Sequence, residues 1–227
     1  MKRFFWAVGT TAALTVACCG GCDKGKSGEN PNNGDASQAS SGGAIDAGVA
    51  ALDVGEWTRA YDAFSEAIAA DPNAVDAYFG RAAASLAIAE ERYRLAEAAA
   101  TNGDVKTGTA EAEKANENFA KAIADCDKTL ELDAKYADAY FIRGVAAQYQ
   151  GDWNAGIEAF TKCVELAPEH AEAYHRRGEI YDHTGDTEHA TVDLKKAAEL
   201  GYRDADGESE SASQEDADVS QTVEERE

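Results

Sequence analysis

The stretch ADAYFIRGVAAQYQGDWNAGIEAFTKCVELAPEH, residues 137–170, decides the fold, because its pattern returns in the next 34 residues, 171–204. Both copies open on alanine, an acid, alanine and tyrosine, and both place Gly-Asp shortly after an internal glycine. Glycine followed by aspartate supplies a tight turn and then a favoured first residue for a helix. Small residues at Gly144 and Gly156 let two antiparallel helices approach closely. The period therefore predicts a helix–turn–helix unit that repeats along the chain.

Two further copies precede this stretch. The phrase VDAYFGRA at 75–82 matches the opening of the unit, and GEW at 55–57 matches the turn GDW at 151–153. Pro72 and Pro168 separate one unit from the next, since proline is tolerated at a helix start but not inside a helix. We place four units at 41–74, 75–136, 137–170 and 171–204. The pattern resembles the tetratricopeptide repeat family. That resemblance implies an all-α fold, a right-handed α-solenoid of helix–turn–helix repeats.

The second unit has 62 residues, which is 28 more than the period. Residues 81–100 contain no helix breaker, and TNGD at 101–104 is a strong turn. From Val105 to Ala122 small and apolar residues recur at alternating spacings of three and four, which is typical of a helical seam. We therefore expect an extended helical hairpin in which each helix gains about 21 Å. A loop that continues to Thr109, because Gly108 weakens the second arm, and a disordered insert are the alternatives.

Residues 1–17 have the layout of a secretory signal, a short basic start followed by an uncharged apolar run. This run is too short to span a bilayer comfortably as a permanent helix. LTVAC at 14–18 resembles a bacterial lipobox, in which the cysteine receives lipid and becomes the mature N-terminus. We expect lipidation at Cys18, with Cys22 and Cys19 as alternatives; a signal cleaved without lipidation and an uncleaved anchor also stay open. The protein is then extracytoplasmic, lipid-anchored to a bacterial membrane in the periplasm or at the cell surface.

Polar segments flank the repeats. Residues 18–43 are rich in Gly, Ser and Asn, which predicts a flexible tether, and residues 205–227 form an acidic tail that we expect to be disordered. The formal net charge of the chain is −22. Phosphate repels a charge of that sign and size, so binding of nucleic acid through a basic face is excluded.

Motifs for catalysis are missing from the sequence. There is no Gly-rich phosphate loop, no nucleophile elbow and no His-Glu-x-x-His signature. His175, Glu179 and His183 fall on one face of an expected helix, which makes a weak candidate for a metal site and for a metal-dependent enzyme. Cys126 and Cys163 occupy packing positions, where we expect buried free thiols. We therefore expect no catalysis and no cofactor.

The resemblance also implies where a partner binds, because in the family the first helices of successive repeats line a concave groove that holds peptide segments. The equivalent residues here are Ile45, Asp76, Phe79, Asp138, Phe141, Val145, Glu172, His175 and Glu179. Phe79 and Phe141 would offer apolar sockets, and the acids would favour Lys or Arg in the bound segment. This predicts a membrane-tethered adaptor or scaffold that binds another protein. A structural or self-associating envelope protein is the alternative. Arg81, Arg143 and Arg177 recur at one offset, and we expect them to be structural.

Overall fold

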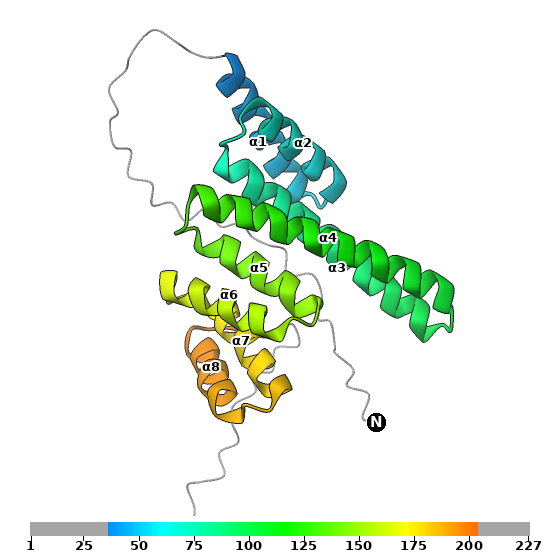
Figure 1. Ribbon diagram of the computed structural model, residues 1–227, viewed down its shortest axis with the longest axis vertical. Coiled ribbons are helices and arrows are strands. Elements are labelled where there is room, and N and C mark those ends of the chain that lie inside the picture. Colours follow the sequence, from blue (N-terminus) through cyan, green and yellow to red (C-terminus); the bar gives the residue numbers. More distant parts are fainter. Residues whose placement is uncertain (1–35, 204–227) are drawn as a thin grey trace, which may run out of the picture. The chain divides into compact units, whose positions relative to one another are not determined.

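The computed structural model of the chain describes residues 36–203, and eight helices account for most of them (Figure 1). These helices are α1 Ala36–Asp53, α2 Trp57–Ala70, α3 Val75–Thr101, α4 Val105–Leu132, α5 Ala137–Tyr149, α6 Trp153–Leu166, α7 Ala171–Thr184 and α8 Thr187–Glu199. No strand occurs between residues 36 and 203, so the all-α prediction is confirmed. Among these helices, none is long and apolar enough to cross a bilayer. The expected signal, the lipidation site and the acidic tail lie outside the described residues.

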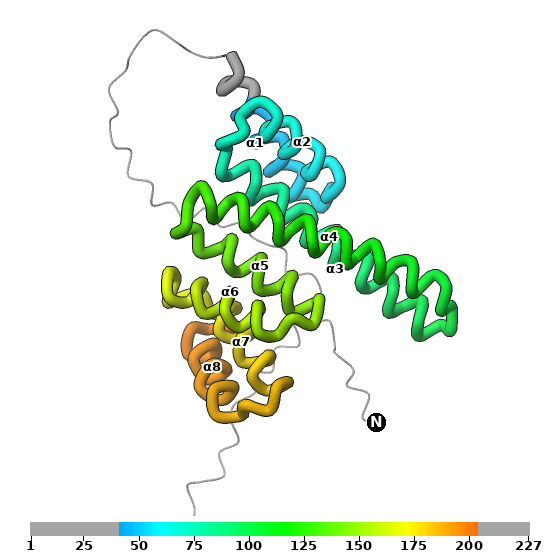
Figure 2. Tube along the Cα trace, viewed as in Figure 1, coloured from blue at the N-terminus to red at the C-terminus, as the bar shows by residue number. Residues whose placement is uncertain are grey.

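Helices α1 to α6 belong to one compact unit that ends at Pro168, and α7 and α8 belong to a second that begins at Glu169. In the first unit each helix packs against the next one, so that three helix pairs are stacked (Figure 2). In the second unit α7 packs against α8 as one further pair. The helix–turn–helix pattern expected from the sequence is therefore present in all four repeats.

Phenylalanine rings pressed against glycines hold the first unit together. Phe64 on α2 is buried, and a Cβ atom added at Gly48 on α1 would come within 2.7 Å of its ring. Phe160 on α6 lies against Gly144 on α5 in the same way, and the corresponding distance is also 2.7 Å. Complete burial of such a ring stabilises the fold by about 2–3 kcal/mol. The small residues at this repeat position therefore make room for the largest side chains of the core.

The turns between paired helices follow the Gly-Asp pattern. Gly151 has a φ of 76°, a left-handed conformation that favours glycine. Asp152 then caps α6, because its side chain accepts a hydrogen bond from the backbone N–H of Ala155 at 3.1 Å. The pair Gly185 and Asp186 has the same role ahead of α8. The sequence motif thus fixes both the end of one helix and the start of the next.

The second repeat forms the extended hairpin that the sequence predicts. Helix α3 has 27 residues and α4 has 28, whereas the helices of the third and fourth repeats have 13 or 14. The extra turns carry the α3–α4 pair well past the ends of α5 and α6 (Figure 1). The turn lies at residues 102–104, and α4 begins at Val105, so the alternative of a loop to Thr109 and that of a disordered insert are wrong.

The two arms of the hairpin approach closely along small residues. A Cβ atom added at Gly108 would lie 3.2 Å from the carbonyl oxygen of Ala96 on the other arm. Ala115 is buried in the same seam, and Arg92 and Glu111 form an ion pair of 3.1 Å between the arms. The first seam residue that we expected, Val105, is instead 73% exposed, because it stands in the first turn beyond the opposite helix end.

Helix α1 starts earlier than the sequence suggested. The tether was expected to reach residue 43 and the repeats to start at 41, but α1 begins at Ala36. The last eight residues of the expected tether are therefore helical. Alanine and glutamine, which are good helix formers, occur in this stretch before Gly42 and Gly43 and favour the extension. Both glycines have open space around them, so they cost helix propensity without disturbing any packing.

Candidate functional site

Helices α1, α3 and α5 share one side of the first unit. Helix α3 contacts both α1 and α5, whereas within residues 36–168 α2 makes no contact with α4, and α4 makes none with α6. The first helices of the three repeats therefore lie closer together than the second helices, as they do on the inner side of a curved stack. We call the surface of α1, α3 and α5 on this side the inner face.

Phe79 and Phe141 lie on inner-face helices but expose little surface. Phe79 is 9% exposed and its ring lies 4.7 Å from that of Tyr136, while Phe141 is 7% exposed and lies 5.8 Å from Phe160. Val145 is buried as well. Aromatic pairs at these centroid distances stabilise packing beyond the area that they bury. The expectation of two open apolar sockets is therefore wrong, because these rings pack within their own repeats.

The accessible part of the inner face is apolar on α1 and acidic on the other two helices. Val49 is 41% exposed, and Ile45, one turn earlier, is half-buried against the core of the first repeat. Asp76 and Asp138 are exposed in the first turns of α3 and α5. A carboxylate in the first turn also complements the helix dipole. These residues thus offer a partner a short apolar row and two carboxylates.

In the second unit, the three expected groove residues of α7 are engaged with neighbours. The Glu172 carboxylate pairs with Arg176 at 3.3 Å, and the Glu179 carboxylate lies 3.3 Å from Nε2 of His175. The ring of His175 also stacks on Tyr202 with a centroid distance of 4.2 Å. Tyr202 follows α8, so this stacking ties the end of the repeat back to its first helix.

The weak metal candidate of α7 is not assembled. His175 and Glu179 do meet, but His175 and His183 are eight positions apart on the helix, about 12 Å of rise, which keeps the two imidazoles away from each other. In the described part of the chain, no group of three or more His, Cys, Asp or Glu side chains could hold a metal ion. The helix-face spacing that suggested this site therefore does not produce one.

Comparisons with known proteins agree with this geometry. Two models of the tetratricopeptide repeat family match the chain, one over residues 137–170 and the other over residues 171–200. Residues 137–200 therefore match tetratricopeptide repeats. Both matches begin at the residues where the sequence pattern places the third and fourth repeats. No curated protein matches the sequence.

Solved structures with tetratricopeptide repeats resemble the fold. A crystal structure of MamA is similar over 70% of this chain and 77% of that chain, at 22% identity and a TM-score of 0.56. The tetratricopeptide repeat domain of Arabidopsis OM64 is similar over 65% of this chain and 98% of that chain, at 22% identity and a TM-score of 0.51. The first such domain of Spaghetti (RPAP3), bound to the HSP90 peptide SRMEEVD, is similar over 65% and 95%, at 20% identity and a TM-score of 0.50. At these identities the likeness concerns the fold.

The recurring arginines of the repeats bind carboxylates inside the protein. Arg81 on α3 donates two hydrogen bonds to Asp125 on α4, of 2.8 and 2.7 Å, and this pairing raises the pKa of the guanidinium. Arg177 on α7 binds Asp193 on α8 in the same two-pronged way, at 2.7 and 2.8 Å. Arg143 has no acid at the matching position and lies 3.1 Å from Asp127 of the preceding repeat. The arginines are thus structural, as expected.

Sequence reasoning missed the acidic partners of these arginines. Arg177 and Asp193 are 16 residues apart, and Arg81 and Asp125 are 44 apart, which is the same offset once the 28-residue insertion is removed. The sequence does carry a signal for these aspartates. Each follows the arginine of its repeat by 16 residues, once the insertion is removed, so the arginine lies on the first helix and the aspartate on the second.

Within residues 36–203, Cys126 and Cys163 are buried free thiols, as expected. Burial raises the pKa of Cys163 to about 12 and raises that of Cys126 as well. A thiol with such a pKa is almost fully protonated at neutral pH, and the thiolate is the nucleophilic form. These residues therefore fill space in the helical core and are poor nucleophiles.

Proposed function

We propose that the chain is a protein–protein interaction adaptor that binds a polypeptide segment on its inner face while an N-terminal lipid tethers it to a bacterial membrane. The direct contacts of α3 with both α1 and α5 carry the proposal, because they leave a continuous surface across three repeats. Tetratricopeptide repeats at 137–200 support it, since repeat stacks present extended surfaces for binding.

The side chains available on the inner face define the kind of segment that fits. Val49 and Ile45 offer an apolar contact on α1, and Asp76 and Asp138 place negative charge along α3 and α5. A segment with an apolar anchor followed by lysine or arginine complements this arrangement. The peptide in the Spaghetti (RPAP3) structure, SRMEEVD, is rich in acids. The acidic inner face of the present chain favours a segment of the opposite charge.

Site-specific photocrosslinking in cells tests this role. A crosslinkable residue at Val49 should capture a partner protein, and capture should fall when Asp76 and Asp138 are both changed to lysine. The matched control places the same residue at Glu66, which is exposed on α2, outside the inner face. Equal capture of the same protein from Glu66, or capture that is indifferent to both lysines, would contradict the proposal.

Membrane tethering has its own test. The lipobox-like LTVAC at 14–18 supports Cys18 as the lipidated residue. Changing Cys18 to serine should abolish incorporation of labelled fatty acid and leave the unprocessed precursor. Labelling that persists in this variant but disappears on changing Cys22 would move the lipid to Cys22.

Self-association remains the alternative role, and exposed apolar residues on the hairpin favour it. Leu95 is 45% exposed and Val105 is 73% exposed, on opposite arms. Light scattering at several protein concentrations separates the two roles. A monomeric mass that does not change with concentration excludes self-association, whereas an oligomer dispersed by changing both residues to serine would establish it.

A further inference from the structure

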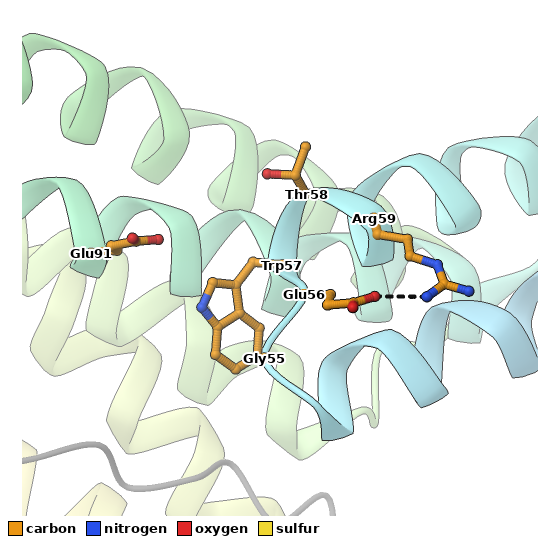
Figure 3. Close-up of a pocket in the computed structure, with 6 residues that line it drawn as sticks. All are labelled: Gly55, Glu56, Trp57, Thr58, Arg59 and Glu91. Carbon is orange, nitrogen blue, oxygen red and sulfur yellow. Dashed lines mark hydrogen bonds and ion pairs between the residues drawn. The ribbon is translucent and has the colours of Figure 1, made fainter.

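An open pocket lies at the end of the first helix pair, away from the inner-face residues described above. It has a volume of about 460 Å³ and is lined by Gly55, Glu56, Trp57, Thr58, Arg59 and Glu91. Figure 3 shows the indole of Trp57 beside the turn at Gly55, with Glu91 projecting from α3 toward the same space. The indole is only partly buried. Part of the indole is therefore accessible beside a carboxylate.

The repeats explain why this aromatic side chain is only partly covered. Phe119 occupies the position in the second repeat that Trp57 occupies in the first, and it is completely buried. Its ring is stacked at 4.8 Å by Tyr149 on the first helix of the following repeat. The residue that corresponds to Tyr149 one repeat earlier is Ala87, whose methyl group cannot extend over an indole. Trp57 thus lacks the aromatic lid that Phe119 has.

The long hairpin supplies the acidic wall of the pocket. Helix α3 continues to Thr101, so Glu91, one turn after Ala87, faces the turn at Gly55 instead of lying beyond the helix end. Glu91 is exposed, and none of the ion pairs among residues 36–203 involves it. The other charges of the pocket, Glu56 and Arg59, neutralise each other at 2.7 Å. The pocket therefore combines an indole with one uncompensated negative charge.

The chain itself shows which side chain suits an aromatic ring beside a carboxylate. Arg81 lies 5.6 Å from the ring centre of Tyr61 and is held by Asp125. Arg177 lies 5.6 Å from the ring centre of Tyr174 and is held by Asp193. Arginine combines a planar cation that stacks on aromatic faces with donors that match a carboxylate. Tryptophan is the strongest aromatic partner for such a cation.

We propose that the Trp57–Glu91 pocket binds an arginine side chain of a partner polypeptide, whose guanidinium stacks on the indole and pairs with the Glu91 carboxylate. Val49, Asp76 and Asp138 do not line this pocket, so it gives the protein a second contact point besides those residues. The strong negative charge of the chain adds a long-range attraction for such a partner.

Titration of the full chain with a blocked Gly-Arg-Gly peptide, followed by NMR of the tryptophan indole N–H resonances, tests the proposal. The resonance of Trp57 should move saturably, while that of Trp153 stays in place. A citrulline peptide, which has nearly the same shape without the charge, should leave Trp57 unmoved. Glu91→Gln should weaken the response by about two- to fivefold, as expected for an exposed ion pair. Ala87→Tyr should abolish it by restoring the missing lid.

Glu113→Gln is the matched control, because Glu113 is also exposed on the hairpin but does not line the pocket. This variant has the same net charge as Glu91→Gln and should bind the peptide as the unchanged chain does. The proposal is overturned if Trp57 does not respond, if the citrulline peptide acts equally, or if Glu113→Gln weakens binding as much as Glu91→Gln. A persistent response in a folded Ala87→Tyr variant would overturn it as well.

Discussion

The pair Arg81–Asp125 should be among the most costly polar contacts of the protein to break. Both side chains are mostly buried, with 21% and 10% of their surface exposed, and two hydrogen bonds of 2.8 and 2.7 Å join them. Removing one partner of a fully buried pair costs about 3–5 kcal/mol, because the other charge is left without compensation. Partial solvent access of the guanidinium lowers this estimate, so Asp125→Ala should reduce the free energy of unfolding by about 2–3 kcal/mol.

Urea unfolding of the full chain, followed by circular dichroism, measures this cost. The comparison variant is Glu56→Ala, which breaks the pair with Arg59 whose side chains are 71% and 51% exposed, and which should change stability by less than about 1 kcal/mol. A double variant that replaces both Arg81 and Asp125 by leucine should recover most of the loss, because no buried charge then remains unpaired. The reasoning fails if Asp125→Ala lowers the free energy of unfolding no more than Glu56→Ala does. The comparison requires that the dependence of this free energy on urea concentration is the same in both variants.

Three further predictions concern packing, thiol reactivity and helix capping. Gly144→Ala should lower thermal stability by the equivalent of about 1–3 kcal/mol, because its Cβ would lie 2.7 Å from a buried ring, whereas Gly42→Ala, with open space around it, should be neutral or stabilising. Cys163 should resist alkylation at neutral pH and react only in denaturant, since burial raises its pKa to about 12; peptide mapping by mass spectrometry would show any labelling in the native chain. Hydrogen bonds from the side chain and the backbone N–H of Thr107 lower the pKa of Asp104, so capping of α4 should be fully present above the ordinary value of 3.8 and be lost as the pH falls through the lowered pKa. Backbone chemical shifts at the start of α4 would then stay helical in acid if the cap had no role.

The repeats and the hairpin could be predicted because each depends on local signals that the fold does not override. The turn TNGD at 101–104 separates two uninterrupted helical runs, and the structure places the hairpin turn at the same residues. Gly108 was a weaker signal, since glycine costs only about 1 kcal/mol within a helix. Close packing against the backbone of Ala96 offsets that cost, and this contact depends on the other arm, which periodicity does not show.

The candidate site was harder to predict, because exposure depends on neighbours that are distant in the sequence. Phe79 and Phe141 were assigned to the inner face by repeat position, and their helices do lie there. Whether the rings are available, however, is decided by Tyr136 and Phe160, which cover them. Val49 lies one helical turn beyond Ile45 and stays exposed. Repeat position thus predicts which helix a residue belongs to, but not how much of its side chain a partner can reach.

The insertion explains both departures from a regular repeat, the hairpin and the pocket. In the third repeat the first helix ends at Tyr149, and the ring of Tyr149 covers that of Phe119 in the preceding repeat. In the second repeat α3 does not end there, and Ala87 stands at that position within a continuing helix. The continuing helix provides a wall bearing Glu91, while the small residue leaves Trp57 partly exposed. If this account is correct, deleting the hairpin while keeping Ala87 should remove the response of Trp57 to the arginine peptide without removing the tryptophan. An unchanged response in that folded variant would mean that the turn at Gly55 alone forms the binding surface.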